Sequence, residues 1–222
     1  MTEVNVSQVK GVLFDLDGTL ADTAPDMIAA LNMALQANGY NQVGFDALRA
    51  SASHGSVAMI KTALPDITDE LVPLLQQSLF DHCQLINGDS CQLFSGLDLL
   101  LARLTELEIP YGIVSNKPAR FTRPLLNRLG LTANMPTIVS GDTTHHSKPH
   151  TAPMLLGAQQ LNVAPQHILY LGDAERDMVA AKAAGMISGL AQWGYISSSD
   201  MIDEWPADIR FKTGECLNNF FN

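Results

Sequence analysis

Short apolar runs alternate with helical periodicity along most of this chain. The run Val12–Phe14 is typical of a buried strand, and it ends in the polar sequence Asp15-Leu16-Asp17-Gly18. Strands that alternate with helices predict an α/β fold with a Rossmann-like parallel sheet and helices on both faces. The later predicted strands are Tyr111–Ser115, Thr137–Ser140, Ile168–Leu171, Ser188–Ala191 and Ile209–Phe211.

Between the first and second predicted strands, the chain shows helical patterns only. We expect residues 23–92 to form a helical cap over the carboxyl edge of the sheet, where such folds bind ligands. Residues 1–22 and 93–222 then form the α/β core. The predicted helices of the first interval are Asp22–Asn38, Asp46–Ala50, Ser56–Leu64 and Thr68–Ile86, and those of the core are Leu97–Leu107, Pro118–Leu129, Ala152–Leu161, Glu175–Ala184 and Gly214–Phe221.

Composition narrows the class of protein. The 222 residues are 46% hydrophobic, which suffices for a sizeable core, and the net charge of −10 argues against a nucleic-acid or anionic-membrane partner. The first residues lack the features of a signal peptide, and no apolar run approaches the roughly 18 residues of a membrane span. The odd set Cys83, Cys91 and Cys216 has no metal-ligand spacing, which favours reduced thiols. We expect a cytoplasmic protein, monomeric or weakly dimeric.

The first candidate chemistry is the pair Asp15 and Asp17. Side chains two apart on a strand point the same way, so both carboxylates should emerge together where the strand ends. Two adjacent anions repel unless a cation or a shared proton intervenes, and oxygen ligands favour Mg²⁺. The alternative is that one aspartate caps a helix and the other lies in a turn.

Polar residues also follow the later strands. Ser115-Asn116-Lys117 follows the second strand, Lys148-Pro149 follows the third, and Gly172–Asp177 follows the fourth. Because the carboxyl ends of parallel strands share one edge, these residues should converge.

The ordered set D-L-D-G-T, S-N-K, K-P and G-D-A-E-R-D resembles the haloacid dehalogenase superfamily. The helical block after the first motif is similar to members that carry a cap at that position. The resemblance covers essentially the whole chain and points to the phosphoglycolate phosphatase-like branch, which includes N-acetylmuramic acid 6-phosphate phosphatases.

The resemblance implies a role for each acidic motif residue. Asp15 is then the nucleophile that becomes an aspartyl phosphate, and Asp17 is the general acid and base. It implies that Mg²⁺ is held by the Asp15 carboxylate, the Asp17 main-chain carbonyl and Asp173. Asp177 would lie near the metal, through water or by orienting Lys148.

The resemblance also implies residues that bind phosphate. Ser115 would donate to a phosphoryl oxygen, and Lys148 would balance its charge. Further expected substrate contacts are Gly18, Thr19, Asn116 and Lys117 in the core, with His54 and Gly55 in the cap stretch Ser51–Ser56. We expect Gly55 to permit close approach of that stretch to the leaving group.

Simpler interpretations remain for each residue. Asp173 can cap the following helix with Asp177 as a solvated first-turn carboxylate, and Ser115 and Lys148 can be a strand-end hydroxyl and a surface lysine. The stretch Ser51–Ser56 can be an ordinary interhelical turn. Lys117, Arg120 and Arg123 either include a substrate contact or form a solvated basic face at a helix start, and the second interpretation is favoured.

The sequence therefore predicts a Mg²⁺-dependent phosphatase that hydrolyses the phosphate monoester of a small metabolite through an aspartyl phosphate. Phosphoglycolate and a sugar phosphate such as N-acetylmuramate 6-phosphate are the substrates that the resemblance implies. One alternative is a phosphomutase similar to β-phosphoglucomutase. The other is a non-catalytic phosphate-binding regulatory protein.

Overall fold

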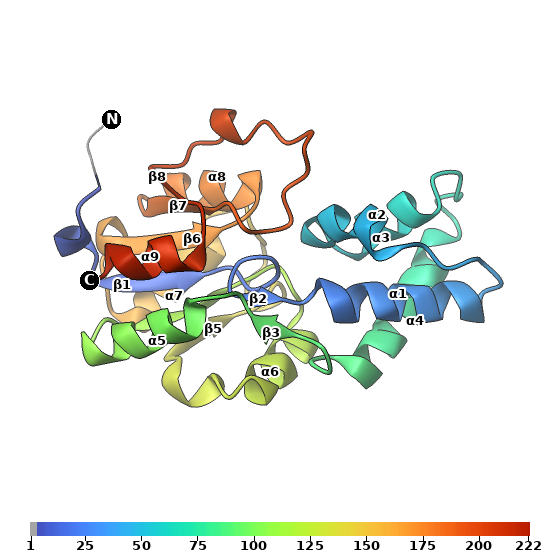
Figure 1. Ribbon diagram of the computed structural model, residues 1–222, viewed down its shortest axis with the longest axis horizontal. Helices are drawn as coiled ribbons and strands as arrows, with labels where there is room; N and C mark the ends of the chain where they lie inside the picture. Colours follow the sequence, from blue (N-terminus) through green and yellow to red (C-terminus); the bar gives the residue numbers. More distant parts are fainter. Residues whose placement is uncertain (1–3) are drawn as a thin grey trace.

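The computed structural model describes residues 4–222 and contains an α/β core beside a group of helices (Figure 1). Residues 1–3, which open the predicted core segment, lie outside the described residues. Parallel strands form the core sheet in the order β5-β4-β1-β6-β7-β8. Their bounds are β1 Gly11–Phe14, β4 Tyr111–Val114, β5 Thr137–Val139, β6 Ile168–Gly172, β7 Ile187–Ala191 and β8 Ile209–Phe211.

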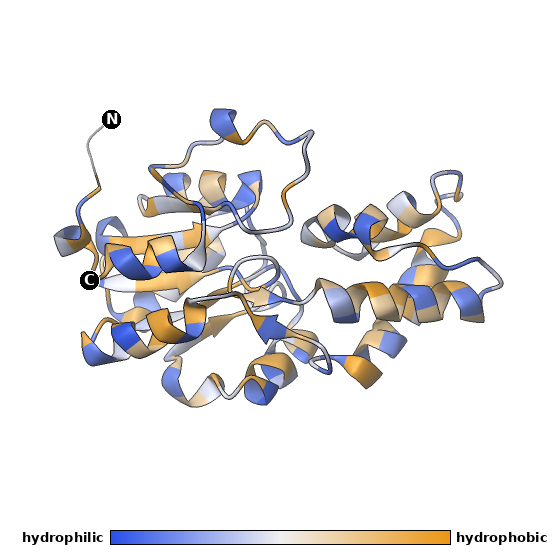
Figure 2. Cartoon of the chain, viewed as in Figure 1, coloured by the Kyte–Doolittle hydropathy of each residue, from blue (hydrophilic) through white to orange (hydrophobic). Residues whose placement is uncertain are grey.

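The central position of β1 explains its uninterrupted apolar sequence. It pairs with β4 on one side and β6 on the other, so both faces of the strand are covered. Val12 and Phe14 pack against one layer of helices and Leu13 against the opposite layer. Figure 2 shows the strands as largely hydrophobic between these layers. The first layer contains α5 Leu97–Glu106, α6 Ala119–Arg128 and α9 Gly214–Phe220, and the second contains α7 Ala152–Leu161 and α8 Glu175–Ala183.

The helices of the interval pack around a third apolar cluster, to which Tyr195 of the core also contributes. Its buried residues within the interval include Ile28, Leu31, Leu48, Ile60 and Leu75. We propose, because most of this cluster lies within the interval, that residues 23–92 are a cap domain distinct from 1–22 and 93–222. Its helices are α1 Ala24–Ala37, α2 Phe45–Arg49, α3 Ser56–Ala63 and α4 Val72–Ile86, with a 3-10 helix at Ala50–His54.

The two passages between core and cap form a feature that the sequence pattern did not predict. β2 Ala21–Asp22 pairs antiparallel with β3 Gln92–Leu93, so the outgoing and returning chains lie side by side. Each strand has only two residues, too few for a period-2 pattern to appear. Asp22 therefore belongs to a strand, and the predicted first cap helix begins later, at Ala24.

Another predicted cap helix also begins later than expected. The pattern predicted Thr68–Ile86, whereas α4 begins at Val72 with Pro73 in its first turn. Proline is common in the first turn of a helix because the N–H groups there have no partner within the helix, and proline has none to leave unpaired.

Among residues 4–222, no helix combines the length and the apolar character needed to cross a membrane.

Candidate active site

Side chains from separate strand ends meet at the carboxyl edge of the sheet. Asp15 follows β1, Ser115 follows β4, Lys148 lies in the segment after β5, and Asp173 follows β6. All four are buried, with at most 3% of each residue exposed. Polar side chains at this depth need partners, and their contacts define the site.

Asp15 is held by donors on both sides of its carboxylate. Its Oδ1 accepts a hydrogen bond of 2.7 Å from the main-chain N–H of Leu16 and lies 3.0 Å from Lys148 Nζ. Its Oδ2 lies 3.9 Å from Arg176 Nη2. Burial raises the pKa of Asp15, but Lys148, Arg176 and Ser115 together hold it below the usual value. Asp15 is therefore an ionised, buried carboxylate at neutral pH.

Lys148 bridges two carboxylates. Its Nζ also lies 2.7 Å from Asp177 Oδ1 and donates to the Tyr170 hydroxyl at 2.7 Å. The other oxygen of Asp177 accepts the N–H of Ala174 at the start of α8. Asp177 thus orients Lys148, and neither side chain is exposed. The interpretations of Lys148 as a surface lysine and of Asp177 as a solvated carboxylate are wrong.

Asn116 holds the backbone that carries Lys148. Its Nδ2 donates to the carbonyl of Lys148 at 3.0 Å, and its Oδ1 accepts the N–H of the same residue at 2.9 Å. The amide side chain thus makes one donated and one accepted hydrogen bond to the same residue. Direct contact of the Asn116 main chain with a substrate stays a prediction.

Three of the carboxylates form a compact cluster. Asp15, Asp173 and Asp177 each offer one oxygen, and these oxygens lie within 4.8 Å of one another. Burial and the neighbouring charges of Asp177 and Asp15 raise the pKa of Asp173 to about 7. The N–H of Tyr195, which donates to Asp173 Oδ2 at 2.8 Å, and the charge of Arg176 offset only part of this rise in the pKa.

The donor set fits a hard divalent cation. The cluster has three carboxylates against two cations, Lys148 and Arg176, which leaves one net negative charge before any phosphate arrives. Its oxygen ligands are of the kind that Mg²⁺ prefers. The Asp17 carboxylate lies outside the cluster, and ligation by the Asp17 carbonyl stays a prediction.

The Asp17 carboxylate contacts a second group of residues. Its Oδ1 accepts a hydrogen bond of 2.6 Å from Thr23 Oγ1 and lies 3.0 Å from Lys117 Nζ. Thr23 occupies the N-cap position of α1, but its side chain makes no capping hydrogen bond there and bonds Asp17 instead. The Lys117 side chain is only 10% exposed.

The interpretation of the basic residues as a solvated face is therefore wrong for Lys117. Burial lowers the pKa of Lys117, but Asp17, Cys83 and Cys91 together raise it by more, so Lys117 stays charged. Arg120 and Arg123 are both exposed on α6, as that interpretation expects. The guanidinium of Arg120 also lies 4.7 Å from the ring centre of Phe80 and 4.8 Å from that of Phe121.

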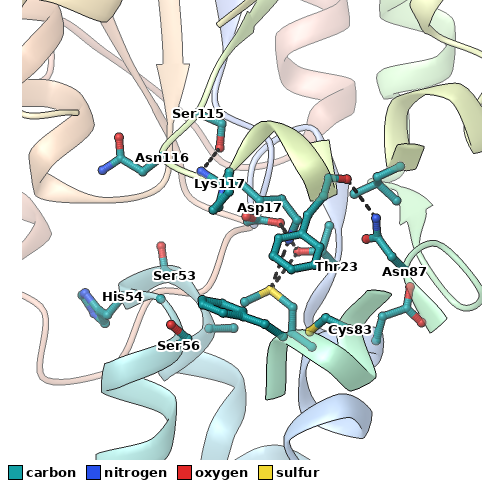
Figure 3. Close-up of a pocket in the computed structure, with 18 of the residues that line it drawn as sticks. Asp17, Thr23, Ser53, His54, Ser56, Cys83, Asn87, Ser115, Asn116 and Lys117 are labelled. Carbon is teal, nitrogen blue, oxygen red and sulfur yellow. Dashed lines mark hydrogen bonds and ion pairs between the residues drawn. The ribbon is translucent and has the colours of Figure 1, made fainter. Parts of the chain in front are cut away.

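A cavity of about 560 Å³ lies between this edge and the cap. Asp15, Asp17, Ser115, Lys117 and Arg176 line its polar end, and Figure 3 shows Ser115, Asn116 and Lys117 facing the cap residues Ser53, His54 and Ser56. The far wall is largely apolar. It contains Met27 of α1, Leu79, Phe80 and Cys83 of α4, and Phe121 and Leu125 of α6.

The predicted cap contacts reach this cavity, because His54 and Gly55 both line it. A Cβ built on Gly55 meets no protein atom within 4 Å, and the φ of +85° favours glycine there because side chains disfavour that backbone conformation. Close approach of Gly55 to a leaving group stays a prediction.

Gly18 and Thr19 do not line the cavity. Their main-chain N–H groups donate to Ala21 and Leu16, which removes them as donors for phosphate. Gly18 has another role. Its φ is +80°, and a Cβ there would lie 2.2 Å from Asp173 Oδ2, so only glycine lets the two loops meet.

The structure adds three residues that the sequence did not single out. Arg176 belongs to a recognised motif but had no assigned role, and it lines the cavity beside Asp15. Ser53 of the cap donates to the Asp173 carboxylate at 3.2 Å. Tyr195 contacts both Asp173 and the start of α1. The last two contacts join distant segments, so no local pattern indicates them.

Comparison with known proteins places this geometry in a family. The family model described as haloacid dehalogenase-like hydrolase matches residues 12–191. A phosphoglycolate phosphatase from Xanthomonas campestris pv. campestris is 38% identical over 200 residues, covering 90% of each chain. An N-acetylmuramic acid 6-phosphate phosphatase from Pseudomonas aeruginosa is 35% identical over 207 residues, covering 91% of this chain and 90% of that protein.

Solved structures show the same fold. A protein from Haemophilus somnus, described as a predicted phosphoglycolate phosphatase, superposes with a TM-score of 0.85 over 97% of this chain and 99% of its own, at 22% identity. β-Phosphoglucomutase from Clostridium difficile superposes with a TM-score of 0.69 over 96% of this chain and 97% of its own, at 18% identity. At these identities the likeness concerns the fold.

The chain belongs to the haloacid dehalogenase-like hydrolase family and is an enzyme of the hydrolase class. The predicted superfamily and α/β fold are confirmed.

Proposed function

We propose that this protein is a Mg²⁺-dependent phosphatase that hydrolyses a small-metabolite phosphate monoester through an aspartyl phosphate on Asp15. The observation that carries the proposal is the buried cluster of Asp15, Asp173 and Asp177, whose oxygens lie within 4.8 Å. Beside this cluster stand Lys148, Arg176 and a cavity large enough for a metabolite. The named phosphatases among the relatives support the same reaction class.

The metal site would be formed by Asp15 and Asp173, with Asp177 as the residue that positions Lys148 beside them. When bound, Mg²⁺ would neutralise the carboxylates and the phosphoryl oxygens together. Oδ1 of Asp177 already contacts Lys148 Nζ and accepts a hydrogen bond from the Tyr170 hydroxyl, which favours a supporting role over direct ligation of the metal.

Asp15 supplies the nucleophilic oxygen. Its lowered pKa keeps it ionised, and the bond that it forms to phosphorus replaces the bond to the leaving alcohol oxygen. Lys148 and Arg176 flank its two oxygens and offset the charge of the incoming phosphate. Ser115 lines the same end of the cavity and would donate to a phosphoryl oxygen.

Asp17 transfers the protons. It would protonate the departing alkoxide and then accept a proton from the water that attacks the aspartyl phosphate, which restores Asp15. Thr23 and Lys117 both contact its Oδ1, so they orient the carboxylate and leave Oδ2 for proton transfer. This Asp17 contact with Thr23 also ties the proton donor to the first residue of the cap.

The cavity favours a leaving group larger than a two-carbon acid. Cavities of roughly 300–1,000 Å³ bury drug-sized ligands, and this one measures about 560 Å³. Its far wall offers Met27, Leu79 and Phe80 for an apolar face. Cys83 on the same wall has a pKa raised by burial to about 11, so it is a neutral surface there. We therefore propose a sugar phosphate, of the size of an amino-sugar 6-phosphate, as the preferred substrate.

Phosphoglycolate is the second candidate. The 38% identity to a protein named phosphoglycolate phosphatase favours it. Its carboxylate would need a polar partner near the leaving-group side. Met27, Leu79 and Phe80 offer none, although the cap also lines the cavity with the polar residues Ser53, His54 and Gln76. Water would also fill much of a cavity of this volume around so small a molecule.

A panel of phosphorylated metabolites tests the proposal. Purified protein is assayed for free phosphate with Mg²⁺, with a chelator, and without any bisphosphate activator. We expect metal-dependent release that is greatest for a hexose-sized monoester. Release that needs a sugar bisphosphate would indicate a phosphomutase, and an absence of release from every monoester would contradict the proposal.

A further inference from the structure

The hydroxyl of Tyr195 replaces the missing cap of the first cap helix. It accepts the main-chain N–H groups of Thr23 at 2.7 Å and Ala24 at 2.8 Å, and it donates to Asp22 Oδ1 at 2.7 Å. These residues mark the end of β2 and the start of α1, where the chain leaves the core. The first N–H groups of a helix have no partner within it, and Thr23 provides no side-chain cap.

The main chain of the same segment contacts the proposed metal site. The N–H of Tyr195 donates to Asp173 Oδ2 at 2.8 Å. Its neighbour Gly194 lies so near that a Cβ there would stand 2.2 Å from the Cβ of Asp173. One residue before it, Trp193 Nε1 donates to the carbonyl of Thr19 in the loop that follows β1. The segment after β7 therefore packs against the catalytic loops.

The cap touches these same groups from the other side. The guanidinium of Arg49, at the end of α2, lies 4.9 Å from the ring centre of Tyr195, which is within cation–π range. Its Nη1 lies 3.4 Å from the carbonyl oxygen of Gly194. Ser53, in the next turn of the cap, donates to Asp173. The cap and Asp173, the proposed metal ligand, therefore both contact the segment that contains Gly194 and Tyr195.

We propose that Tyr195 is a positioning residue that sets the orientation of the cap relative to Asp173 and Asp15. It does not line the cavity and acts through α1, which carries Met27 of the far wall. Loss of the hydroxyl leaves two buried N–H donors without their partner and frees the start of α1 to shift. The inference rests on the proposed phosphatase activity, and it concerns how the cap meets the leaving group.

Tyr195→Phe tests this role because it removes the hydroxyl and keeps the ring and the N–H to Asp173. Tyr111→Phe is the matched control. Tyr111 is also buried, and its hydroxyl lies 3.4 Å from Thr105 Oγ1, away from the cavity. Both variants and the unmodified protein are assayed with saturating Mg²⁺ on p-nitrophenyl phosphate, whose leaving group is a ring, and on acetyl phosphate, whose two-carbon leaving group offers the cap far less contact.

We expect Tyr195→Phe to lower kcat/KM for p-nitrophenyl phosphate about tenfold and for acetyl phosphate less than about threefold, as expected when a remote shift misplaces one part of a substrate. Tyr111→Phe should leave both values within about twofold. Equal losses on the two substrates, or no loss, would overturn the inference. Lack of hydrolysis by the unmodified protein would instead contradict the proposed function.

Hydrogen exchange supplies a readout that needs no turnover. With its partner removed, the start of α1 should exchange faster in Tyr195→Phe, and so should the cap segment 49–53 that packs on the ring. Tyr111→Phe should leave both segments unchanged. Unchanged exchange in Tyr195→Phe would rule out a positioning role, whatever the activity.

Discussion

The ammonium group of Lys148 lies 3.0 Å from a carboxylate oxygen of Asp15, and no part of the lysine side chain is exposed. One residue follows β1 and the other lies in the segment after β5, so the parallel sheet brings them to one edge, where Asn116 holds the backbone of Lys148. A buried lysine is stable only when its charge is compensated, and Asp177 provides the second partner. The nucleophile proposed here and a cation that can offset the charge of a phosphate are therefore already in contact before substrate binds.

The first prediction concerns pH and metal binding. Burial and the neighbouring carboxylates raise the pKa of Asp173 from the ordinary 3.8 to about 7, so a proton competes with Mg²⁺ below pH 7. Apparent Mg²⁺ affinity should rise about tenfold per pH unit up to pH 7 and level off above it. Titration calorimetry at pH 6, 7 and 8 measures this dependence.

The same shift affects stability with a definite sign. The raised pKa of Asp173 stabilises the metal-free fold below pH 3.8, and this contribution is lost as the pH rises through 7. The gain in Tm on adding Mg²⁺ should therefore be larger at pH 8 than at pH 6. Asp173→Asn should remove that difference, and equal gains in the unmodified protein would contradict the assignment of Asp173.

The second prediction separates backbone strain from a specific contact. Gly18 and Gly39 have φ values of +80° and +81°, but only Gly18 faces Asp173, while a Cβ at Gly39 meets nothing within 4 Å. Alanine at Gly39 should cost about 1–2 kcal/mol of folding free energy through backbone strain, and alanine at Gly18 should cost more because its Cβ also clashes with Asp173. Only Gly18→Ala should also weaken Mg²⁺ binding, by about tenfold or more. Similar Mg²⁺ affinities in the two variants would refute the contact.

The third prediction tests how Lys148 is held. Asn116→Ala removes both hydrogen bonds to the backbone of Lys148, and we expect kcat to fall about 10–100-fold with a smaller change in KM. Asn38→Ala is the control, because Asn38 makes its side-chain bonds within the cap, to Ala34 and Ser78. A kcat in Asn116→Ala within twofold of the control would show that contacts other than Asn116 hold the backbone of Lys148 in place.

The fourth prediction concerns the apolar wall. Leu79 and Leu75 are both buried on α4 in the same apolar cluster, but only Leu79 lines the cavity. Replacing either by alanine should cost about 2–5 kcal/mol of stability. Below the unfolding range, Leu79→Ala should lower kcat/KM for a hexose phosphate about fivefold more than Leu75→Ala does, because about 1 kcal/mol of apolar contact with the substrate is lost. Equal kinetic losses would show that the substrate does not reach this wall.

Most of the catalytic edge could be predicted from the sequence because each of its residues follows a recognisable strand. The short run Val12–Phe14 fixes the place of Asp15 and Asp17 in the chain, and the parallel topology brings Asp173 to Asp15. The sequence did not predict that the Asp17 carboxylate contacts a separate group of residues. The burial of Lys117 could not be predicted, since a charged side chain beside other basic residues reads as solvated. Its long stem lets the charge reach Asp17 across the loop.

The cap–core contacts lay beyond the sequence for a different reason. The hydroxyl of Tyr195 meets residues 22–24, and Ser53 meets Asp173, across long separations with no shared period. The two-residue strands β2 and β3 pair with each other across about 70 residues of chain. Tertiary packing decides such contacts, whereas hydrophobic periodicity reports only which face of an element is buried.

The replacement of Asp15 tests the central claim most directly. Asp15→Asn and the unmodified protein are compared for Mg²⁺-dependent hydrolysis of p-nitrophenyl phosphate, with Asn116→Ala as a variant that keeps the nucleophile. We predict that Asp15→Asn loses activity at least about 10³-fold, while Asn116→Ala retains measurable turnover. Undiminished hydrolysis by a pure preparation of Asp15→Asn would show that no phosphoryl group passes through Asp15.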